Sequence, residues 1–182
     1  TITIVAAAAA LVLTGASPVS AATVTFTPVA DTYVQSDAAS SNFGTASRIV
    51  VDNSPVRRVF LRFVVSGTSG AVTAAKLRLR VGSGTSDGGP SGGAFRGVSN
   101  TTWSETGTTW NNQPAIDGVP LGSLGAVSVN QWVEIDVRPL VSGNGTFSIG
   151  VTSSNQDGTY YDSRETGFVN GLLDAIATEV RQ

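Results

Sequence analysis

The sequence predicts an all-β protein, an antiparallel β-sandwich of the jelly-roll type. Short runs of alternating apolar and polar residues follow one another, turn residues separate them, and the body of the chain has no long helical period. Many short strands with turns between them are typical of sandwiches and jelly rolls. The alternation also argues against a parallel α/β sheet, whose strands are apolar on both faces.

The strand signals lie at residues 24–27, 32–34, 48–51, 57–65, 76–81, 127–129, 132–137 and 146–151, and from Tyr160 onward. Within 57–65 every second residue is apolar, which predicts one face on a core. The segment 76–81 alternates most clearly, with three apolar residues facing one way and Lys76, Arg78 and Arg80 the other. The glycine- and serine-rich stretch 82–93 is a predicted loop.

Composition excludes several functions. The chain has 182 residues, which suits one domain, and it lacks cysteine and histidine. It therefore has no disulfide, no thiolate nucleophile and no histidine base. A net charge of -2 argues against general binding to nucleic acid, which requires a basic surface.

Residues 1–22 are predicted to be a signal peptide with a truncated start. Their apolar run Ile2 to Leu13 has the length of a signal-peptide core and is too short for a transmembrane helix. Small residues at Val19 to Ala22 suit cleavage. We therefore expect a secreted, extracellular protein without a membrane anchor.

Several short motifs occur along the chain from about residue 24 to residue 167. They are ADTYV (30–34), NFG (42–44), RRVFLRF (57–63), AAKLRL (74–79), WSE (103–105), TWNNQP (109–114) and SRE (163–165). In order and spacing they resemble the DNRLRE-type domain, which is also classed as carbohydrate-binding module family 96. The resemblance implies a jelly-roll sandwich of secreted bacterial proteins, often beside polysaccharide-degrading domains. It also implies polysaccharide binding, since some members bind acidic polysaccharides such as alginate.

The leader and the resemblance together divide the chain into a signal peptide at 1–22, a sandwich at 23–167 and an atypical tail at 168–182. Members of the family usually follow SRE with a proline and one more apolar strand. Here Leu172, Leu173, Ile176 and Val180 have helical spacing, as a frameshift would produce. If the final strand is missing, we expect a neighbouring strand to become an exposed edge.

The candidate ligand-binding residues are the outward cations of two strands and one tryptophan: Arg58, Arg62, Lys76, Arg78, Arg80 and Trp132. Neighbouring strands would merge the cations into a basic stripe for a polymer with regularly spaced carboxylates. The alternative is a solvated face whose cations pair with Asp and Glu. Trp103 and Trp110 are predicted to be structural, whereas Trp132 shares a strand face with two carboxylates and is expected to be exposed.

A structural calcium site is a further candidate. Asp31, Asp37, Asn42 and Asp52 lie near turns and offer the oxygen ligands that calcium prefers. The alternative is that these residues cap turns. No other cofactor is expected. Arg164 and Glu165, with Asp162, are interpreted as a structural ion pair.

The leading functional hypothesis is a secreted, non-catalytic and monomeric carbohydrate-binding module for acidic polysaccharide. It would target a partner catalytic domain, or the cell wall, to its polysaccharide. One alternative is a structural or adhesive module of the cell surface without a sugar site. The other is a polysaccharide lyase with Tyr160 or Tyr161 as its base, since such an enzyme needs no histidine. A glycosidase is not favoured, because no motif orders the pair of carboxylates that it requires.

Overall fold

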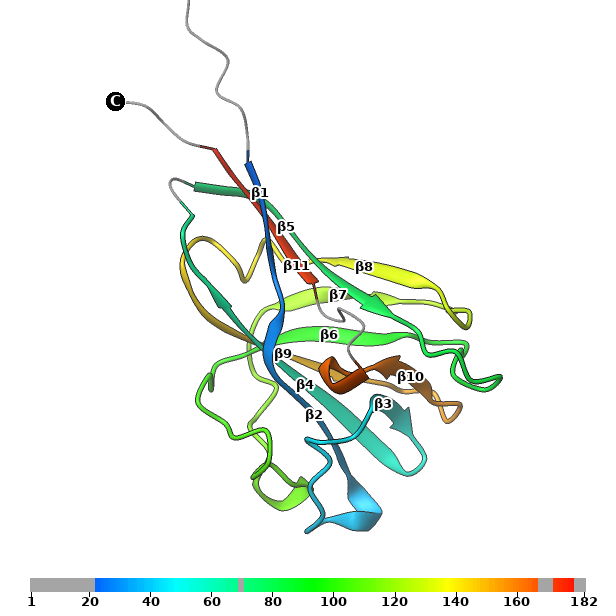
Figure 1. The fold of residues 1–182 in the computed structure, drawn as a ribbon. Coiled ribbons are helices and arrows are strands. Elements are labelled where there is room, and N and C mark those ends of the chain that lie inside the picture. Colours follow the sequence, from blue (N-terminus) through cyan, green and yellow to red (C-terminus); the bar gives the residue numbers. More distant parts are fainter. Residues whose placement is uncertain (1–21, 69–70, 167–171, 179–182) are drawn as a thin grey trace, which may run out of the picture.

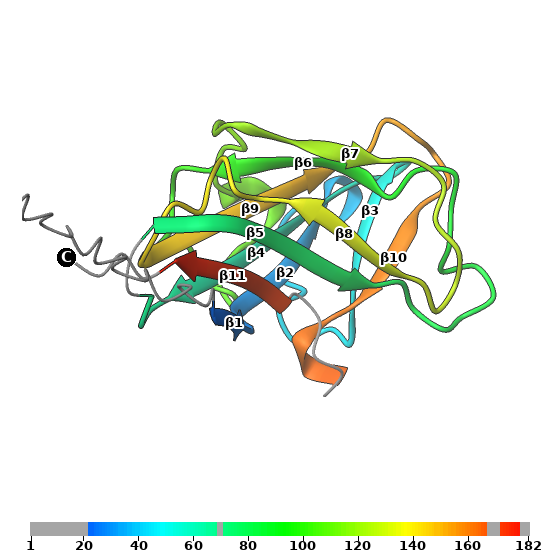
Figure 2. The same ribbon diagram turned by 90° about the horizontal axis from the view of Figure 1, so that it is seen from above.

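Two antiparallel sheets pack face to face in the computed structural model, which describes residues 22–68, 71–166 and 172–178 (Figures 1 and 2). The smaller sheet has the order β1-β11-β5-β8, and the larger has the order β10-β3-β4-β9-β6-β7 with β2 also paired to β4. The predicted all-β antiparallel sandwich is therefore confirmed.

The smaller sheet consists of β1 (Ala22–Phe26), β5 (Ala71–Arg80), β8 (Trp132–Asp136) and β11 (Leu172–Thr178). The larger sheet consists of β2 (Pro28–Gln35), β3 (Arg48–Asn53), β4 (Val56–Val65), β6 (Gly93–Val98), β7 (Pro120–Leu124), β9 (Gly145–Thr152) and β10 (Thr159–Asp162). Three single turns of 3₁₀ helix lie at Ser36–Ala38, Trp110–Asn112 and Arg164–Thr166.

The main core fills the space between the sheets. Alternation along β4 and β5 sends every second side chain inward, as the sequence predicted. The largest buried contributors to this core include Ile49, Leu61, Phe63, Leu77, Leu79, Phe95, Ile149 and Tyr161. Burial of a side chain of this size stabilises the fold by roughly 1.5–3 kcal/mol.

A second, smaller core lies on the outer face of the larger sheet. Phe60 points away from the main core and is fully buried against Val34, Val98 and Trp103. The segment between β6 and β7, residues 99–119, supplies Trp103 and covers this part of the sheet. The outer faces of the two sheets therefore have different environments.

The C-terminal segment corrects one expectation. The helical spacing interpreted from Leu172 to Val180 is wrong for residues 172–178, because β11 is a strand between β1 and β5. Two neighbouring strands satisfy its backbone groups, so sheet pairing outweighs a weak local periodicity. The condition under which a neighbouring strand would become an exposed edge, a missing final strand, is therefore not met over these residues.

Two further strands escaped prediction because glycine and proline interrupt them. β6 begins at Gly93, whose φ is +100° and whose added Cβ would lie 2.7 Å from Val151 Cγ1. Glycine is thus required there by close packing rather than by a turn. Conversely, the strand predicted at 127–129 is wrong, since Val127 forms only an isolated bridge with Gly89.

The predicted signal peptide lies outside the described residues except for Ala22, where β1 begins. It stays a prediction. In the described part of the chain, no helix has the length and apolar character needed to span a bilayer.

Replacing Tyr161 with phenylalanine tests the packing between β10 and β6. The buried Tyr161 hydroxyl donates to the carbonyl of Gly92 at 2.7 Å. We expect Y161F to lower the free energy of unfolding by about 1–2 kcal/mol, since a buried acceptor loses its donor. Denaturant unfolding measures this, with Y160F as the matched control. Equal effects of the two substitutions would contradict the role of the Tyr161 hydrogen bond.

Candidate functional site

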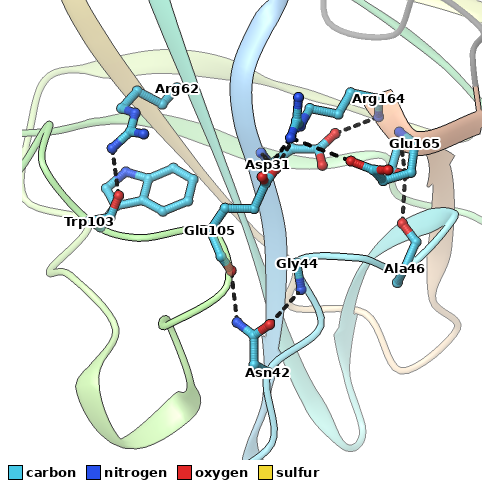
Figure 3. Close-up of polar contacts among 10 residues, drawn as sticks. Asp31, Asn42, Gly44, Ala46, Arg62, Trp103, Glu105, Arg164 and Glu165 are labelled. Atoms are coloured by element: carbon cyan, nitrogen blue, oxygen red, sulfur yellow. Dashed lines mark hydrogen bonds and ion pairs between the residues drawn. The ribbon is translucent and has the colours of Figure 1, made fainter.

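The Glu105 carboxylate joins segments that are far apart in the sequence (Figure 3). Its Oε1 accepts from the Asp31 backbone N–H at 2.8 Å and from Arg164 Nε at 2.7 Å, and its Oε2 accepts from Arg164 Nη2 at 2.7 Å. The Arg164 backbone N–H in turn donates to Asp31 Oδ2 at 2.7 Å. Parallel guanidinium–carboxylate bonds are among the strongest side-chain contacts. We call Asp31, Asn42, Glu105 and Arg164 the motif network.

Asn42 holds the backbone of the same region. Its Nδ2 donates to the carbonyls of Glu105 and Thr108, both at 2.7 Å, and its Oδ1 accepts from the Gly44 N–H at 3.1 Å. A Cβ at Gly44 would lie 2.2 Å from the Glu105 carbonyl oxygen, so only glycine fits this approach. The NFG, WSE and SRE motifs therefore form one structural cluster. Their contacts with one another support the fold.

Asp31 is the buried member of the motif network. It is 1% exposed, and its Oδ1 has no hydrogen-bond partner among the described residues. Burial raises the pKa of Asp31 to about 6, although the hydrogen bond from the Arg164 N–H opposes this shift. The Arg164 pair expected from the sequence is present with Glu165 at 3.4 Å and is closer with Glu105. Asp162 pairs instead with Arg80.

Arg58 and Arg62 lie on the outer face of the larger sheet, under the 99–119 segment. The Arg58 guanidinium stacks 4.8 Å from the Trp110 ring centroid, and that of Arg62 lies 5.1 Å from the Trp103 ring centroid. Arg62 also donates to the Trp103 carbonyl at 2.5 Å (Figure 3). Both arginines therefore pack against the covering segment. The expected structural role of Trp103 agrees with its burial and with the bond from its Nε1 to Ser148 Oγ.

Lys76, Arg78 and Arg80 lie on β5, in the other sheet. The five predicted cations therefore do not form one stripe, because β4 and β5 belong to different sheets. Alternation placed each residue on an outer face, but it could not show which sheet the strand would join.

The outer face of the smaller sheet brings together the remaining candidates. Register places Arg80 opposite Trp132 and Arg78 opposite Glu134. Trp132 is 43% exposed, as predicted, and the Arg78 guanidinium lies 5.1 Å from its ring centroid. This exposed aromatic ring with an adjacent cation is the candidate binding surface.

Carboxylates pair with all three cations of this face. Glu134 lies 2.8 Å from Lys76 Nζ and 3.1 Å from Arg78 Nε, and Asp162 accepts from Arg80 at 2.6 Å. The hydrogen bond from Lys76 lowers the pKa of Glu134, and the same bond raises the pKa of Lys76. The alternative of a solvated face whose cations pair with Asp and Glu therefore agrees with the described residues of this surface. The two exposed pairs of Glu134 contribute only about 0–1 kcal/mol each, whereas the Arg80–Asp162 pair is largely buried.

Two hollows lie elsewhere on the described surface. One has a volume of about 370 Å³ and is lined by serines, glycines and Leu124 of the larger sheet, without an aromatic ring. The other, of about 200 Å³, is lined by Tyr33, Ala46, Ser47, Arg48, Val50 and Tyr160. Sequence reasoning missed this second hollow, since its residues come from β2, the loop before β3, β3 and β10 and share no motif.

The four candidate calcium ligands each have hydrogen-bond partners within the protein. Asp37 accepts from Gln35 at 2.5 Å, and Asp52 accepts from two backbone N–H groups and from Arg57. Among the described residues, no group of three or more His, Cys, Asp or Glu side chains is arranged to hold a metal ion. Calcium binding by these residues stays a prediction.

The fold defines a β-sandwich module with an exposed tryptophan ring on the outer face of its smaller sheet. The family model for carbohydrate-binding module family 96 matches residues 22–172. The chain belongs to this family, which confirms the resemblance based on its motifs. A comparison with curated proteins found no match.

Glu105→Gln tests the motif network. The substitution turns one carboxylate oxygen at Arg164 into an amide group, so we expect the free energy of unfolding to fall by about 1–2 kcal/mol. Glu165→Gln is the matched control, because Glu165 is more exposed and lies 3.4 Å from the same guanidinium. We expect its effect to stay within about 0.5 kcal/mol. Equal losses in thermal or denaturant unfolding would argue against the central role of Glu105.

The raised pKa of Asp31 predicts a pH dependence. Folded Asp31 keeps its proton up to about pH 6, whereas unfolded aspartate releases it near pH 4. The folded state therefore binds more protons in this window, and its stability falls as pH rises from about 4 to 6. Asp31→Asn cannot titrate. We expect the wild type to lose stability relative to D31N across this window, and parallel unfolding curves would contradict the shift.

Proposed function

We propose that this module binds acidic polysaccharide, such as alginate, on the outer face of the smaller sheet. The observation on which this depends is the exposed Trp132 ring with the Arg78 guanidinium beside it. Membership of a carbohydrate-binding module family supports sugar as the ligand class. The two neighbouring cations and the tryptophan support this surface as the site.

Trp132 has the properties of a stacking platform. Its ring projects from β8, whose alternate residues Val133 and Ile135 are buried in the core. The strand therefore holds the ring in place before any ligand arrives, which lowers the entropy cost of binding. An aromatic face can pack on the apolar face of a pyranose ring.

The ion pairs of this face suit an acidic ligand whose carboxylate can replace Glu134. Glu134 occupies Lys76 and Arg78 in the free protein. Because exposed pairs contribute little free energy, a glycan carboxylate can replace Glu134 at small cost. Arg80 is held more firmly by Asp162 and by Asn130 Oδ1 at 2.7 Å. It orients the site and leaves the exchange to Lys76 and Arg78.

The proposed role is targeting without catalysis. A module of this kind raises the local concentration of an attached or neighbouring catalytic domain at the polysaccharide, or anchors it at a cell wall. Secretion, as the predicted leader indicates, would place it beside such polymers. Tyr161, one of the two candidate lyase bases, is fully buried and donates to Gly92, which argues against catalysis by that residue.

Trp132→Ala tests the site. We expect alginate oligosaccharides to bind the variant at least about tenfold more weakly, since the stacking surface is removed. Calorimetric titration measures the affinity. Val64→Ala is the control, because Val64 is equally exposed, at 44%, but lies on the larger sheet. Unchanged binding by W132A would place the site elsewhere.

Glu134→Gln tests the acidic specificity. Removing the competing carboxylate should tighten binding of uronate oligosaccharides and leave binding of neutral oligosaccharides unchanged. Arg78→Gln removes a cation, so it should weaken both uronate binding and the salt dependence of that binding. Equal effects on acidic and neutral ligands would favour a neutral glycan.

A surface adhesive or structural module without a sugar site is the second candidate. It is favoured by the pairing of every cation on this face and by the structural role of the motif network. A folded sample that binds no member of an acidic and neutral glycan panel would support it.

A further inference from the structure

One corner of the sandwich joins the outer faces of the two sheets. At the end of β5, Val81 forms an antiparallel bridge with Tyr161 of β10, and the Gly82 N–H donates to the Tyr160 carbonyl at 3.0 Å. β10 pairs along its other side with β3. Strands β8, β5, β10 and β3 thus lie side by side at this corner, as Figure 2 shows.

The register across this corner aligns outward residues in one row. Trp132 is opposite Arg80, and Asp162 is opposite Arg48. The Val81–Tyr161 bridge places Arg80 beside Asp162, and their 2.6 Å ion pair agrees with this placement. Three interstrand spacings separate the ends of the row, a distance of about 14 Å.

The two ends of the row are exposed, and its middle is an ion pair with little exposed surface. The Arg80 and Asp162 side chains are only 18% and 9% exposed, so they form a floor. The Arg48 side chain at one end is 48% exposed, and Trp132 at the other is 43% exposed. A chain molecule can therefore lie across the floor and contact both ends.

The Arg48 end is the hollow of about 200 Å³ between Tyr33 and Tyr160. The Arg48 guanidinium lies 5.2 Å from the Tyr160 ring centroid and is anchored by Asp87, which accepts from Nη1 at 2.6 Å. Tyr33 stacks on Phe43 with ring centroids 4.3 Å apart. Arg48 and Tyr33 are thus both held in position without a ligand.

This lining suits one sugar ring. Tyrosine rings and Val50 offer apolar contact, while the Arg48 guanidinium and the hydroxyls of Ser47 and the tyrosines offer hydrogen bonds. The volume is below the roughly 300–1,000 Å³ of sites for drug-sized ligands. The larger hollow on the same sheet lacks an aromatic ring, and so lacks a stacking surface.

We propose that the Tyr33–Arg48–Tyr160 hollow is a second subsite, which takes a single hexopyranose unit of an oligosaccharide whose other end stacks on Trp132. The Trp132 end of this track depends on the proposed function, whereas the hollow is argued from its own lining. The ligand crosses from one sheet to the other over the Arg80–Asp162 floor. Occupying both ends makes affinity depend on chain length.

The chain composition allows the two ends to be observed separately. It has three tyrosines and three tryptophans. Two tyrosines line the hollow and the third, Tyr161, is buried; Trp132 is the exposed tryptophan among the described residues. Protein labelled with ¹³C in tyrosine rings and ¹⁵N in tryptophan indoles therefore reports each end by NMR, with Tyr161 as an internal control.

The probes are methyl β-glucopyranoside, methyl β-glucuronoside and an alginate tetrasaccharide. We expect a methyl glycoside to shift the Tyr33 and Tyr160 ring signals, and the tetrasaccharide to shift these and the Trp132 indole. Comparing the shifts caused by the glucoside with those caused by the glucuronoside shows whether the hollow prefers a neutral or an acidic sugar.

Tyr160→Ala should weaken tetrasaccharide binding at least about tenfold. Tyr160→Phe keeps the ring and should retain binding, and Arg96→Ala is an unrelated exposed control on β6.

Each outcome decides between the two proposals. Tetrasaccharide shifts at Trp132 without tyrosine shifts would overturn the second subsite and leave the proposed function intact. Tyrosine shifts without a Trp132 response would support the hollow and contradict the site on the smaller sheet. No response to any probe would overturn both, and wild-type affinity in Y160A would overturn the second subsite even if its rings shift.

Discussion

The bidentate contact between Glu105 and Arg164 is the constraint on which the arrangement of the loops depends. It connects residues separated by 59 positions, and Glu105 also accepts from Asp31, 74 positions away. The chain has no cysteine, so no disulfide can connect these segments. Oriented charge-assisted hydrogen bonds and the Asn42 contacts perform this role instead. The network leaves Asp31 buried with an unsatisfied oxygen, and this burial cost raises the pKa of Asp31 to about 6, so the carboxyl is neutral only below about that pH.

The outer face of the larger sheet is covered by the 99–119 segment, whereas the outer face of the smaller sheet is exposed. Similar strands therefore have different roles in the two sheets. β4 and β5 both alternate apolar residues with cations. On β4 the cations stack against tryptophans of the 99–119 segment and help to enclose a second core around Phe60. On β5 no described segment covers the equivalent face, and Arg78 stacks against a tryptophan that is itself exposed. The contact between arginine and an aromatic ring is therefore part of an enclosed core in the larger sheet and exposed in the smaller sheet.

The exposed face combines rigid support with exchangeable charge. Strands whose alternate residues fill the core hold their outward side chains in place, which suits a binding surface better than a loop would. The two ion pairs of Glu134 partly neutralise Lys76 and Arg78 in the free protein, and they cost little to exchange. The corner at β10 extends the surface toward a second group of aromatic side chains. Such an extended, shallow surface suits a polymer more than a small molecule.

The sequence by itself determined the fold class, most strand positions, the family and the exposure of Trp132, because two-residue alternation and short motifs are local properties of the chain. It could not reveal β6 and β7, whose glycines and proline resemble turns, or β11, whose strand state depends on pairing with β1 and β5. Tertiary structure alone decided that Arg58 and Arg62 belong to a different sheet from Lys76, Arg78 and Arg80, and that Tyr33, Arg48 and Tyr160 share one hollow. Alternation determines which side of its own strand a residue occupies, whereas strand order and register, set by contacts between distant segments, determine which residues become neighbours.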